Sequence, residues 1–477
     1  MITALDHAST VKLYNTRTRA VEPFKPINAP EVGLYTCGPT VYSYAHIGNM
    51  RSYIFADTLR RTLNYFGYKV NHVMNITDVG HLTNDSDDGE DKMEIGSAQE
   101  GLTAWDVAQK YTDAFFDHAQ KLNIQRPETV CKATDHIKEQ IEMVSKLEAK
   151  GFTYKTDDGV YFNTDKFDRY AEFAKLDVEG LQSGHRVEAG GKKSKTDFAL
   201  WKFSPSNAKR QMEWDSPWGR GFPGWHIECS AMATRFLGEQ FDIHTGGVDH
   251  VNIHHTNEVA QSECALGKSP WVNVWMHGEF LVEGESTKMS KSLGNVLTVQ
   301  TLVENGYDPR AYRLLCLQTH YRKQLKFTDD NMAAASKFFE KLHKFSLELL
   351  QESDGEPSKI TAAMRPWIEK LEAAMANDLN TPQALASLSA VLDDASLNTT
   401  EKVGLIERHD VILGLNLFEE NKSQGTVPSE MLDLLKRRNQ ARADKNWAEA
   451  DKMRDEISAK GYEILDSPEG SSLKRKH

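Results

Sequence analysis

A short segment of the sequence has the residue types and spacing to bind a phosphate group. His46, Gly48 and Asn49 follow an apolar run that ends at Cys37, and they open a stretch with helical spacing of apolar residues. The first amides of a helix are unpaired and attract anions, so His46 and Asn49 can both face one bound phosphate. The alternative is a helix-opening turn that carries two incidental polar residues.

A second segment, far downstream, concentrates charge and hydroxyl groups. The run from Lys288 to Ser292 reads Lys-Met-Ser-Lys-Ser and offers two ammonium groups and two hydroxyls. Gly284 precedes this run and Gly294 follows it, which predicts a mobile surface loop. Taken alone, such a loop is ordinarily solvated, and its charge does not identify a ligand.

Four side chains of types that bind zinc are spread along the chain. His254 and Glu258 are four residues apart on a predicted helix and therefore point to one face. Cys229 lies at the start of another predicted helix, and Cys37 ends the first strand. If the sheet brings its strand ends together, two thiolates, one imidazole and one carboxylate meet. The alternative is that both cysteines are ordinary buried thiols.

A parallel sheet would place these groups at one edge. The run ending at Cys37 predicts a strand, the stretch that follows Asn49 and ends at Phe66 a helix, and the segment 68–76 a second strand, which together form a βαβ unit. Thr77 follows, where open parallel sheets bind ligands. A further predicted strand has a glycine-rich end, where Asp249 either contacts a ribose or ammonium group or stabilises the turn.

The composition bounds the class of protein. The chain has 477 residues, too many for one core, and its net charge is −12 with 26% charged and 39% hydrophobic residues. An acidic chain does not exclude a nucleic-acid partner, because a local basic surface suffices. Five cysteines form no disulfide framework, and neither a signal pattern nor an apolar run of membrane-spanning length is present. We therefore expect a cytoplasmic location and no membrane association.

The paired segments resemble the two signatures of class I aminoacyl-tRNA synthetases. Further motifs are similar to the cysteinyl-tRNA synthetase family, and the similarity runs from about Val11 to Lys476. These motifs are Cys-Gly-Pro-Thr-Val-Tyr from Cys37, Asn-Ile-Thr-Asp from Asn75, Gly-Trp-His-Ile-Glu-Cys-Ser-Ala-Met from Gly224, His-His-x-Asn-Glu from His254 and Asn-Trp-Ala-Glu-Ala-Asp from Asn446.

The resemblance implies an α/β fold. It consists of a Rossmann-like parallel-sheet catalytic domain with an inserted domain, followed by an α-helical bundle and a small C-terminal anticodon-binding domain. The expected boundaries are 1–122 and 210–270 for the two halves of the catalytic domain, 123–209 for the inserted domain, 271–330 for the signature-loop domain, 331–420 for the bundle and 421–477 for the anticodon-binding domain.

The resemblance also implies roles for individual residues. One Zn²⁺ per chain would be bound by Cys37, Cys229, His254 and Glu258. The cysteine substrate would contact Gly38, Thr77, Trp225 and His244. ATP, with Mg²⁺, would contact His46, Gly48, Asn49, Asp249, Lys288, Ser290 and Lys291, of which His46, Asn49, Lys288 and Lys291 would be catalytic.

The implied reaction has two steps. L-cysteine and ATP give cysteinyl-adenylate and pyrophosphate, and the cysteinyl group then passes to the 3′ end of tRNA(Cys). Zinc would select the thiol substrate, because it binds thiolate far better than a neutral hydroxyl. We expect a monomer.

The sequence differs from the usual pattern of the family at two places, and two alternative functions remain open. The family usually has a second histidine where Asn49 stands, and many members have further acidic residues where Val79-Gly-His-Leu stands. One alternative is a ligase of the same ancestry that joins cysteine to an amino sugar and lacks the anticodon-binding end. The other is a non-catalytic nucleotide- or RNA-binding paralogue, against which the intact His46, Lys288 and Lys291 argue.

Overall fold

The computed structural model describes most of the chain. The described residues are 3–5, 10–80, 91–176, 191–205, 210–283, 287–288, 297–353, 360–419, 429–443, 446–467 and 470–475. Among them, no helix is both long and apolar enough to cross a membrane.

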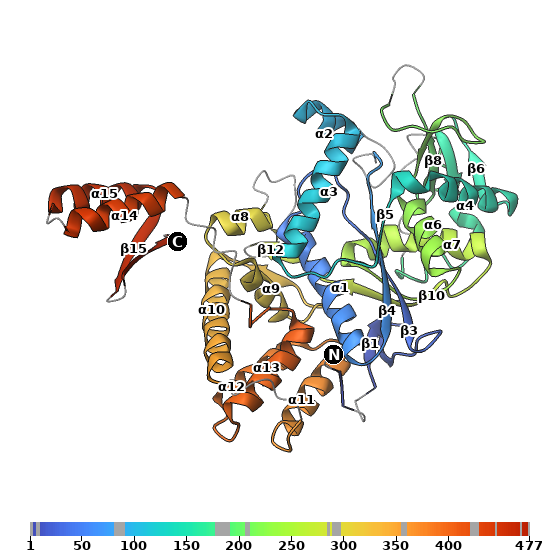
Figure 1. The fold of residues 1–477 in the computed structure, drawn as a ribbon. Helices are drawn as coiled ribbons and strands as arrows, with labels where there is room; N and C mark the ends of the chain where they lie inside the picture. The colour runs from blue at the N-terminus through green and yellow to red at the C-terminus, as the bar shows by residue number, and fades with distance from the viewer. Residues whose placement is uncertain are drawn as a thin grey trace.

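A five-stranded parallel sheet forms the centre of the larger part of the molecule (Figure 1). Its strands are β3 (Glu31–Thr36), β4 (Lys69–Ile76), β5 (Thr129–Lys132), β10 (Phe241–Gly247) and β11 (Val272–Gly278). Their order is β11-β10-β3-β4-β5, and every neighbouring pair is parallel. The chain places β4 and β5 on one side of β3, and later places β10 and β11 on its other side. A ligand crevice is therefore expected at the carboxyl ends of β3 and β10, where the strand order reverses.

Helices cover both faces of this sheet because successive side chains of a strand point to opposite sides. In β3, Leu34 packs in the same core as α1 (Ile47–Tyr65), whereas Tyr35 packs in the core that holds the other helices. Those helices are α4 (Ile137–Ala149), α6 (Trp225–Leu237) and α7 (Thr256–Leu266). The predicted strand, helix and strand of the first βαβ unit are β3, α1 and β4, which confirms that prediction.

Smaller sheets and two helices surround this centre. An antiparallel sheet of order β6-β7-β8-β9 falls between α4 and α6 in the sequence, and its strands are Thr153–Lys155, Gly159–Phe162, Phe198–Phe203 and Gly221–Pro223. The hairpin β1-β2 comprises Lys12–Asn15 and Ala20–Pro23, and the sheet β13-β12-β14 comprises Thr287–Lys288, Leu281–Glu283 and Leu325–Phe327. The helices are α2 (Lys92–Glu100) and α3 (Ala104–Lys121).

A helical region follows and lies beside α1 (Figure 1). It comprises α8 (Val299–Glu304), α9 (Pro309–Leu317), α10 (Asp329–Glu352), α11 (Arg365–Ala376), α12 (Thr381–Asp393) and α13 (Thr399–Leu413). The last four of these helices, α10 to α13, lie between residues 329 and 413, where the resemblance implies a helical bundle.

A buried ion cluster joins α1 to this helical region. The Asp57 carboxylate accepts hydrogen bonds from Arg61 Nε at 2.7 Å and from Arg313 Nη2 at 2.6 Å. Arg313 Nε also donates to the backbone oxygen of Leu413 at 2.6 Å, at the end of α13. Burial opposes ionisation, but the two guanidinium groups hold the pKa of Asp57 below its ordinary value. The cluster therefore fixes α1 against α9 and α13.

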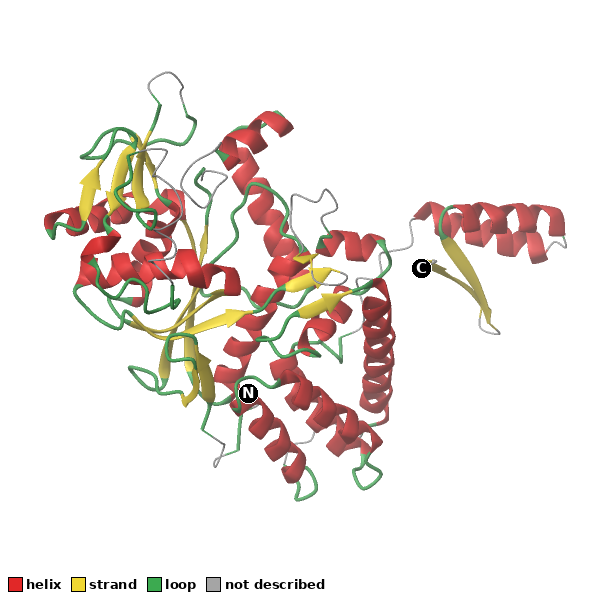
Figure 2. Ribbon diagram, turned by 180° about the vertical axis from the view of Figure 1, so that it is seen from behind, coloured by secondary structure: helices red, strands yellow, loops and turns green. Residues whose placement is uncertain are grey.

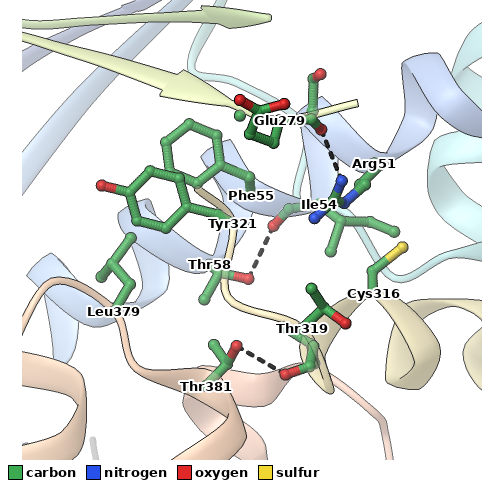
Figure 3. Close-up of a pocket in the computed structure, with 13 residues that line it drawn as sticks. Arg51, Ile54, Phe55, Thr58, Glu279, Cys316, Thr319, Tyr321, Leu379 and Thr381 are labelled. Atoms are coloured by element: carbon green, nitrogen blue, oxygen red, sulfur yellow. Dashed lines mark hydrogen bonds between the residues drawn. The ribbon is translucent and has the colours of Figure 1, made fainter. Parts of the chain in front are cut away.

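A small cavity lies at the same junction (Figure 3). Its wall includes Arg51 and Phe55 of α1, Glu279 after β11, Cys316 of α9 and Thr381 of α12. Its volume is about 20 Å³, which suits a single water molecule and excludes a substrate.

The last part of the chain forms a unit that lies apart from the rest in both views (Figures 1 and 2). It comprises α14 (Ser429–Ala443), α15 (Trp447–Ala459), β15 (Tyr462–Ser467) and β16 (Gly470–Arg475). It has its own apolar core of Met431, Leu434, Leu435, Met453 and Ile457. The antiparallel hairpin β15-β16 follows the two helices.

Candidate active site

A cavity of about 300 Å³ opens where the sheet order reverses. One part of its wall is the segment 36–40, which leaves the carboxyl end of β3. Asn49 and Ser52 of α1 form another part, and Gly246 and Asp249, at and just after the end of β10, form a third. This is the edge at which open parallel sheets bind their ligands.

The start of α1 is stabilised by a reciprocal pair of hydrogen bonds. His46 Nδ1 accepts from the backbone N–H of Asn49 at 3.0 Å, and Asn49 Oδ1 accepts from the backbone N–H of His46 at 3.2 Å. Because Nδ1 is an acceptor, the neutral His46 ring carries its proton on Nε2. The predicted phosphate-binding pair is thus also the capping pair of the helix.

Gly38 allows two strand ends to approach each other closely. A Cβ atom on Gly38 would lie 1.5 Å from the backbone oxygen of Asn75, which no side chain can tolerate. The Gly38 N–H donates to Asn75 Oδ1 at 2.8 Å, and Asn75 Nδ2 donates to Thr77 Oγ1 at 3.0 Å. Thr77 in turn donates to Glu228 at 3.1 Å. The predicted substrate contacts Gly38 and Thr77 therefore belong to one hydrogen-bonded chain.

The four predicted zinc ligands lie together and are buried. Cys37 Sγ is 3.9 Å from Cys229 Sγ and 3.9 Å from Glu258 Oε1, and His254 Nε2 is 2.9 Å from Glu258 Oε1. A fifth side chain joins them, because His255 Nε2 lies 3.3 Å from Cys37 Sγ. Donor atoms of Cys37, His254, His255 and Glu258 all lie within 4.8 Å of one another.

A π-helical turn brings both histidines into this cluster. The segment Val251–His255 is π-helical and continues directly into α7, which carries Glu258. Such turns are rare and widen the helix, and they occur often at functional sites. The sequence analysis expected His254 and Glu258 on one face of a regular helix and left His255 out. Two signals were available for His255: its place in a His-His pair, and its three-residue spacing from Glu258, which also puts both side chains on one helix face.

Other aromatic side chains fix the orientation of the cluster. His254 Nδ1 lies 2.9 Å from His226 Nδ1, and the ring of Trp225 lies 4.4 Å from the His254 ring. His244 Nε2 lies 3.0 Å from Glu258 Oε2. His255 Nδ1 lies 2.7 Å from His277 Nε2. Contacts of this kind hold ligating rings in place and leave their other nitrogen toward a metal.

The donor set fits a zinc ion. Bond lengths of about 2.0–2.3 Å in a tetrahedral site place donor atoms roughly 3.3–3.8 Å apart, close to the distances between Cys37 and its neighbours. Burial raises the pKa of Cys37, and a divalent cation would offset that effect. Burial also disfavours the charge of Glu258, yet His244 and His254 lower its pKa to about 2.

Of the remaining predicted residues, two belong to the described part of the chain and two do not. Asp249 is exposed and lines the cavity from the turn Val248–His250. Lys288 lies in β13, where its backbone pairs with Val282. Ser290 and Lys291 lie outside the described residues.

Comparison with known families covers most of this chain. Residues 23–337 match the family described as tRNA synthetases class I (C) catalytic domain. Residues 425–470 match the family described as cysteinyl-tRNA ligase anticodon binding domain.

Similar proteins agree with these matches. Cysteine–tRNA ligase 1 of Burkholderia lata is 50% identical over 465 residues, which cover 97% of this chain and 96% of that protein. Cysteine–tRNA ligase of Treponema denticola is 42% identical, with coverage of 98% and 100%. A Mycobacterium tuberculosis methionyl-tRNA synthetase structure, solved with methionyl-adenylate, has a TM-score of 0.57 at 15% identity and covers 85% of this chain and 94% of its own. At that identity the likeness concerns the fold alone.

These findings confirm both the predicted fold class and the resemblance on which it rests. The chain belongs to the cysteine–tRNA ligase family of class I aminoacyl-tRNA synthetases.

Proposed function

We propose that this protein activates L-cysteine with ATP and transfers the cysteinyl group to the 3′ end of tRNA(Cys). One observation carries the proposal: Cys37 belongs both to the buried donor cluster and to the wall of the cavity. A substrate bound in that cavity can therefore place its own thiol beside the cluster. The location at the reversal of strand order suits a nucleotide in the same cavity.

We propose that Cys37, Cys229, His254 and Glu258 hold one zinc ion, with His255 as a further candidate. The ion would supply a soft acceptor that binds thiolate much better than the hydroxyl of serine. Shape alone discriminates poorly between two substrates that differ by one atom. Trp225 and His244 would form the wall around the substrate side chain, and Gly38 and Thr77 would lie beside its backbone groups.

In the first step, the carboxylate of cysteine attacks the α-phosphorus of ATP and pyrophosphate leaves. We propose that His46 Nε2–H, the side-chain amide of Asn49 and the backbone amide of Gly48 donate to phosphate oxygens. Lys288, Ser290 and Lys291 would close over the triphosphate, and Mg²⁺ would accompany ATP. Asp249 would contact the ribose.

In the second step, a hydroxyl of the terminal ribose of tRNA attacks the carbonyl carbon of the adenylate and AMP leaves. We place tRNA recognition partly in the C-terminal unit, because residues 425–470 match an anticodon-binding domain. The ligase that joins cysteine to an amino sugar lacks such an end, and this favours tRNA as the acceptor. We further propose that the protein works as a monomer in the cytoplasm.

Pyrophosphate exchange into ATP tests the first step without tRNA. The purified protein should exchange pyrophosphate when cysteine is supplied and should respond weakly to serine at the same concentration. Exchange that depends equally on both amino acids would contradict the proposed selection of a thiol. Exchange that depends on a different amino acid would contradict the substrate.

A further inference from the structure

A lysine that the sequence analysis did not single out lines the same cavity. Lys92 is the first residue of α2 and shares the cavity wall with Tyr42, Asn49 and Asp249. It is the only lysine or arginine among the described residues that line the cavity. Its side chain thus brings a permanent positive charge to a site that already includes the start of α1.

The start of α2 is held firmly by its neighbours. The Asp91 carboxylate accepts from the backbone N–H groups of Met93 at 2.7 Å and Glu94 at 3.1 Å, and it pairs with Arg210. Arg210 also donates to the backbone oxygen of Gly80 at 3.0 Å. These contacts join the segment after β4, the start of α2 and the connection between β8 and β9, so the backbone at Lys92 is held by two other parts of the chain.

The apolar face of α2 packs against the segment that leaves β3. Met93 is buried in an apolar cluster with Val41 and Ile76. A Cβ atom on Gly96 would lie 3.3 Å from the backbone oxygen of Tyr42, so the helix already packs closely there. Lys92 Nζ lies 5.8 Å from the centre of the Tyr42 ring. The lysine therefore reaches the cavity across one of its walls.

The stability of α2 does not explain a lysine at this position. The first turn of a helix carries a partial positive charge, so a cation there is unfavourable and an anion is preferred. Asp91 and Glu94 follow that preference, whereas Lys92 opposes it. A residue that breaks a local rule at the wall of a cavity is expected to serve a ligand.

The chemistry of the cavity identifies the class of that ligand. Negative charge builds on the α-phosphate while the carboxylate attacks, and a fixed cation stabilises that charge. We propose that Lys92 binds phosphate oxygens of ATP during cysteine activation. This inference rests on the proposed function, because it assumes that ATP occupies the cavity. An ammonium group acts there as a point charge and needs no planar partner.

Three variants in the full-length protein test the assignment: Lys92→Met, Lys92→Arg and the control Lys110→Met. Lys110 lies on α3 and pairs with Glu100 of α2, so its removal changes the charge of the same helix pair outside the cavity. In cysteine-dependent pyrophosphate exchange, Lys92→Met should lower kcat/KM for ATP by about 10- to 100-fold, as expected for one lost charge contact in a transition state. Lys92→Arg should recover most of that loss, and Lys110→Met should match the wild type.

The Michaelis constant for cysteine and the thermal midpoint separate this role from a structural one. A binding role predicts that Lys92→Met leaves both near their wild-type values. If Lys92→Met does not fold, Lys92→Arg with wild-type kinetics supports the role of the charge, and Lys92→Arg with a defect equal for ATP and cysteine contradicts it. Wild-type exchange in Lys92→Met overturns the inference, even if tRNA charging falls, because the lysine would then serve the tRNA. Absence of exchange in the wild type would overturn the proposed function instead.

Discussion

Single atoms at the donor cluster set the chemistry of the candidate site. Cys37 and Cys229 supply sulfur, His254 supplies nitrogen and Glu258 supplies oxygen, all within a buried space. Such a set is stable only when protons or a metal ion offset its negative charges. We therefore expect the metal to be part of the folded site.

Replacement of Cys229 by serine tests the ligand set. The wild-type protein should purify with about one zinc ion per chain, and Cys229→Ser should bind zinc at least about tenfold more weakly, since a hydroxyl is a poor zinc ligand. The matched control is Cys316→Ser, which removes another buried thiol on α9, outside the cluster. Metal analysis after dialysis against a chelator gives the answer. Equal zinc retention in wild type and Cys229→Ser would contradict the assignment.

Sequence reasoning found most of these residues because their types are uncommon together and belong to motifs. His255 was left out because the motif match assigned one histidine only, although its three-residue spacing from Glu258 also places both residues on one face of a helix. Sequence reasoning missed Lys92 for a different reason. Its place at the cavity depends on the contacts of Asp91 with Arg210, which are 119 residues apart.

At the scale of elements, the ends of β3 and β4 lie where we propose that the cysteine substrate binds. Their close approach requires a glycine at position 38, since any Cβ would meet the Asn75 carbonyl. Gly33 lies within β3 itself, and a Cβ there would find its nearest neighbour at 3.4 Å, an ordinary contact. These two glycines therefore differ in what an added methyl group would do.

We predict that Gly38→Ala lowers cysteine activation by about 100-fold, because the displaced backbone misplaces reacting groups by up to an ångström. Gly33→Ala should stay near wild type in the same exchange assay. Circular dichroism of both variants checks that the fold persists. Equal activity of Gly38→Ala and Gly33→Ala would show that the site tolerates separation of the strand ends.

The ion cluster at Asp57 connects the same α1 helix to the helical region. Asp57→Ala should destabilise the protein by about 3–5 kcal/mol at neutral pH, because Arg313 is left buried without its partner. The control Asp117→Ala removes another carboxylate paired at four-residue spacing, but its side chain is 55% exposed, against 1% for Asp57. We expect about 0–1 kcal/mol there. Thermal unfolding of the three proteins measures both effects.

The pH dependence of the Asp57 contribution has a definite sign. The folded-state pKa of this carboxyl is lowered, so its contribution is complete above the unfolded value of about 3.9. It is lost as the pH falls through the lower folded value. The difference between wild type and Asp57→Ala should therefore be constant from pH 5 to 7 and shrink in acid. A difference that grows toward low pH would contradict this account.

Elements with strong periodicity were predicted well, and others were not. The helix α1 follows a clear apolar spacing and ends next to Gly67, and the structure has it at Ile47–Tyr65. The helix α13 contains Gly404, which weakens a helical signal, and its burial in the bundle compensates. The β15-β16 hairpin is short and polar, so its apolar residues show neither the helical period nor the alternation of a strand.

At the scale of the whole molecule, the C-terminal unit has its own core and is separated from the residues of the candidate site. Removal of everything after Glu419 should leave cysteine-dependent exchange nearly intact and strongly reduce transfer to tRNA. Trp447, which is 60% exposed at the start of α15, is available for stacking on an unpaired base. Equal loss in exchange and in charging would mean that this unit supports the catalytic fold.

The central claim is that the full-length protein charges tRNA(Cys) with cysteine. The most direct measurement supplies the protein with ATP, labelled cysteine and a tRNA(Cys) transcript, and follows label that is precipitated with the tRNA and released by mild base. We predict cysteine esterified to the tRNA at close to one molecule per active acceptor end, and far less product when serine replaces cysteine. Rapid cysteine-dependent pyrophosphate exchange without any charging of tRNA(Cys) would contradict the claim, because the activated cysteine would then have another acceptor.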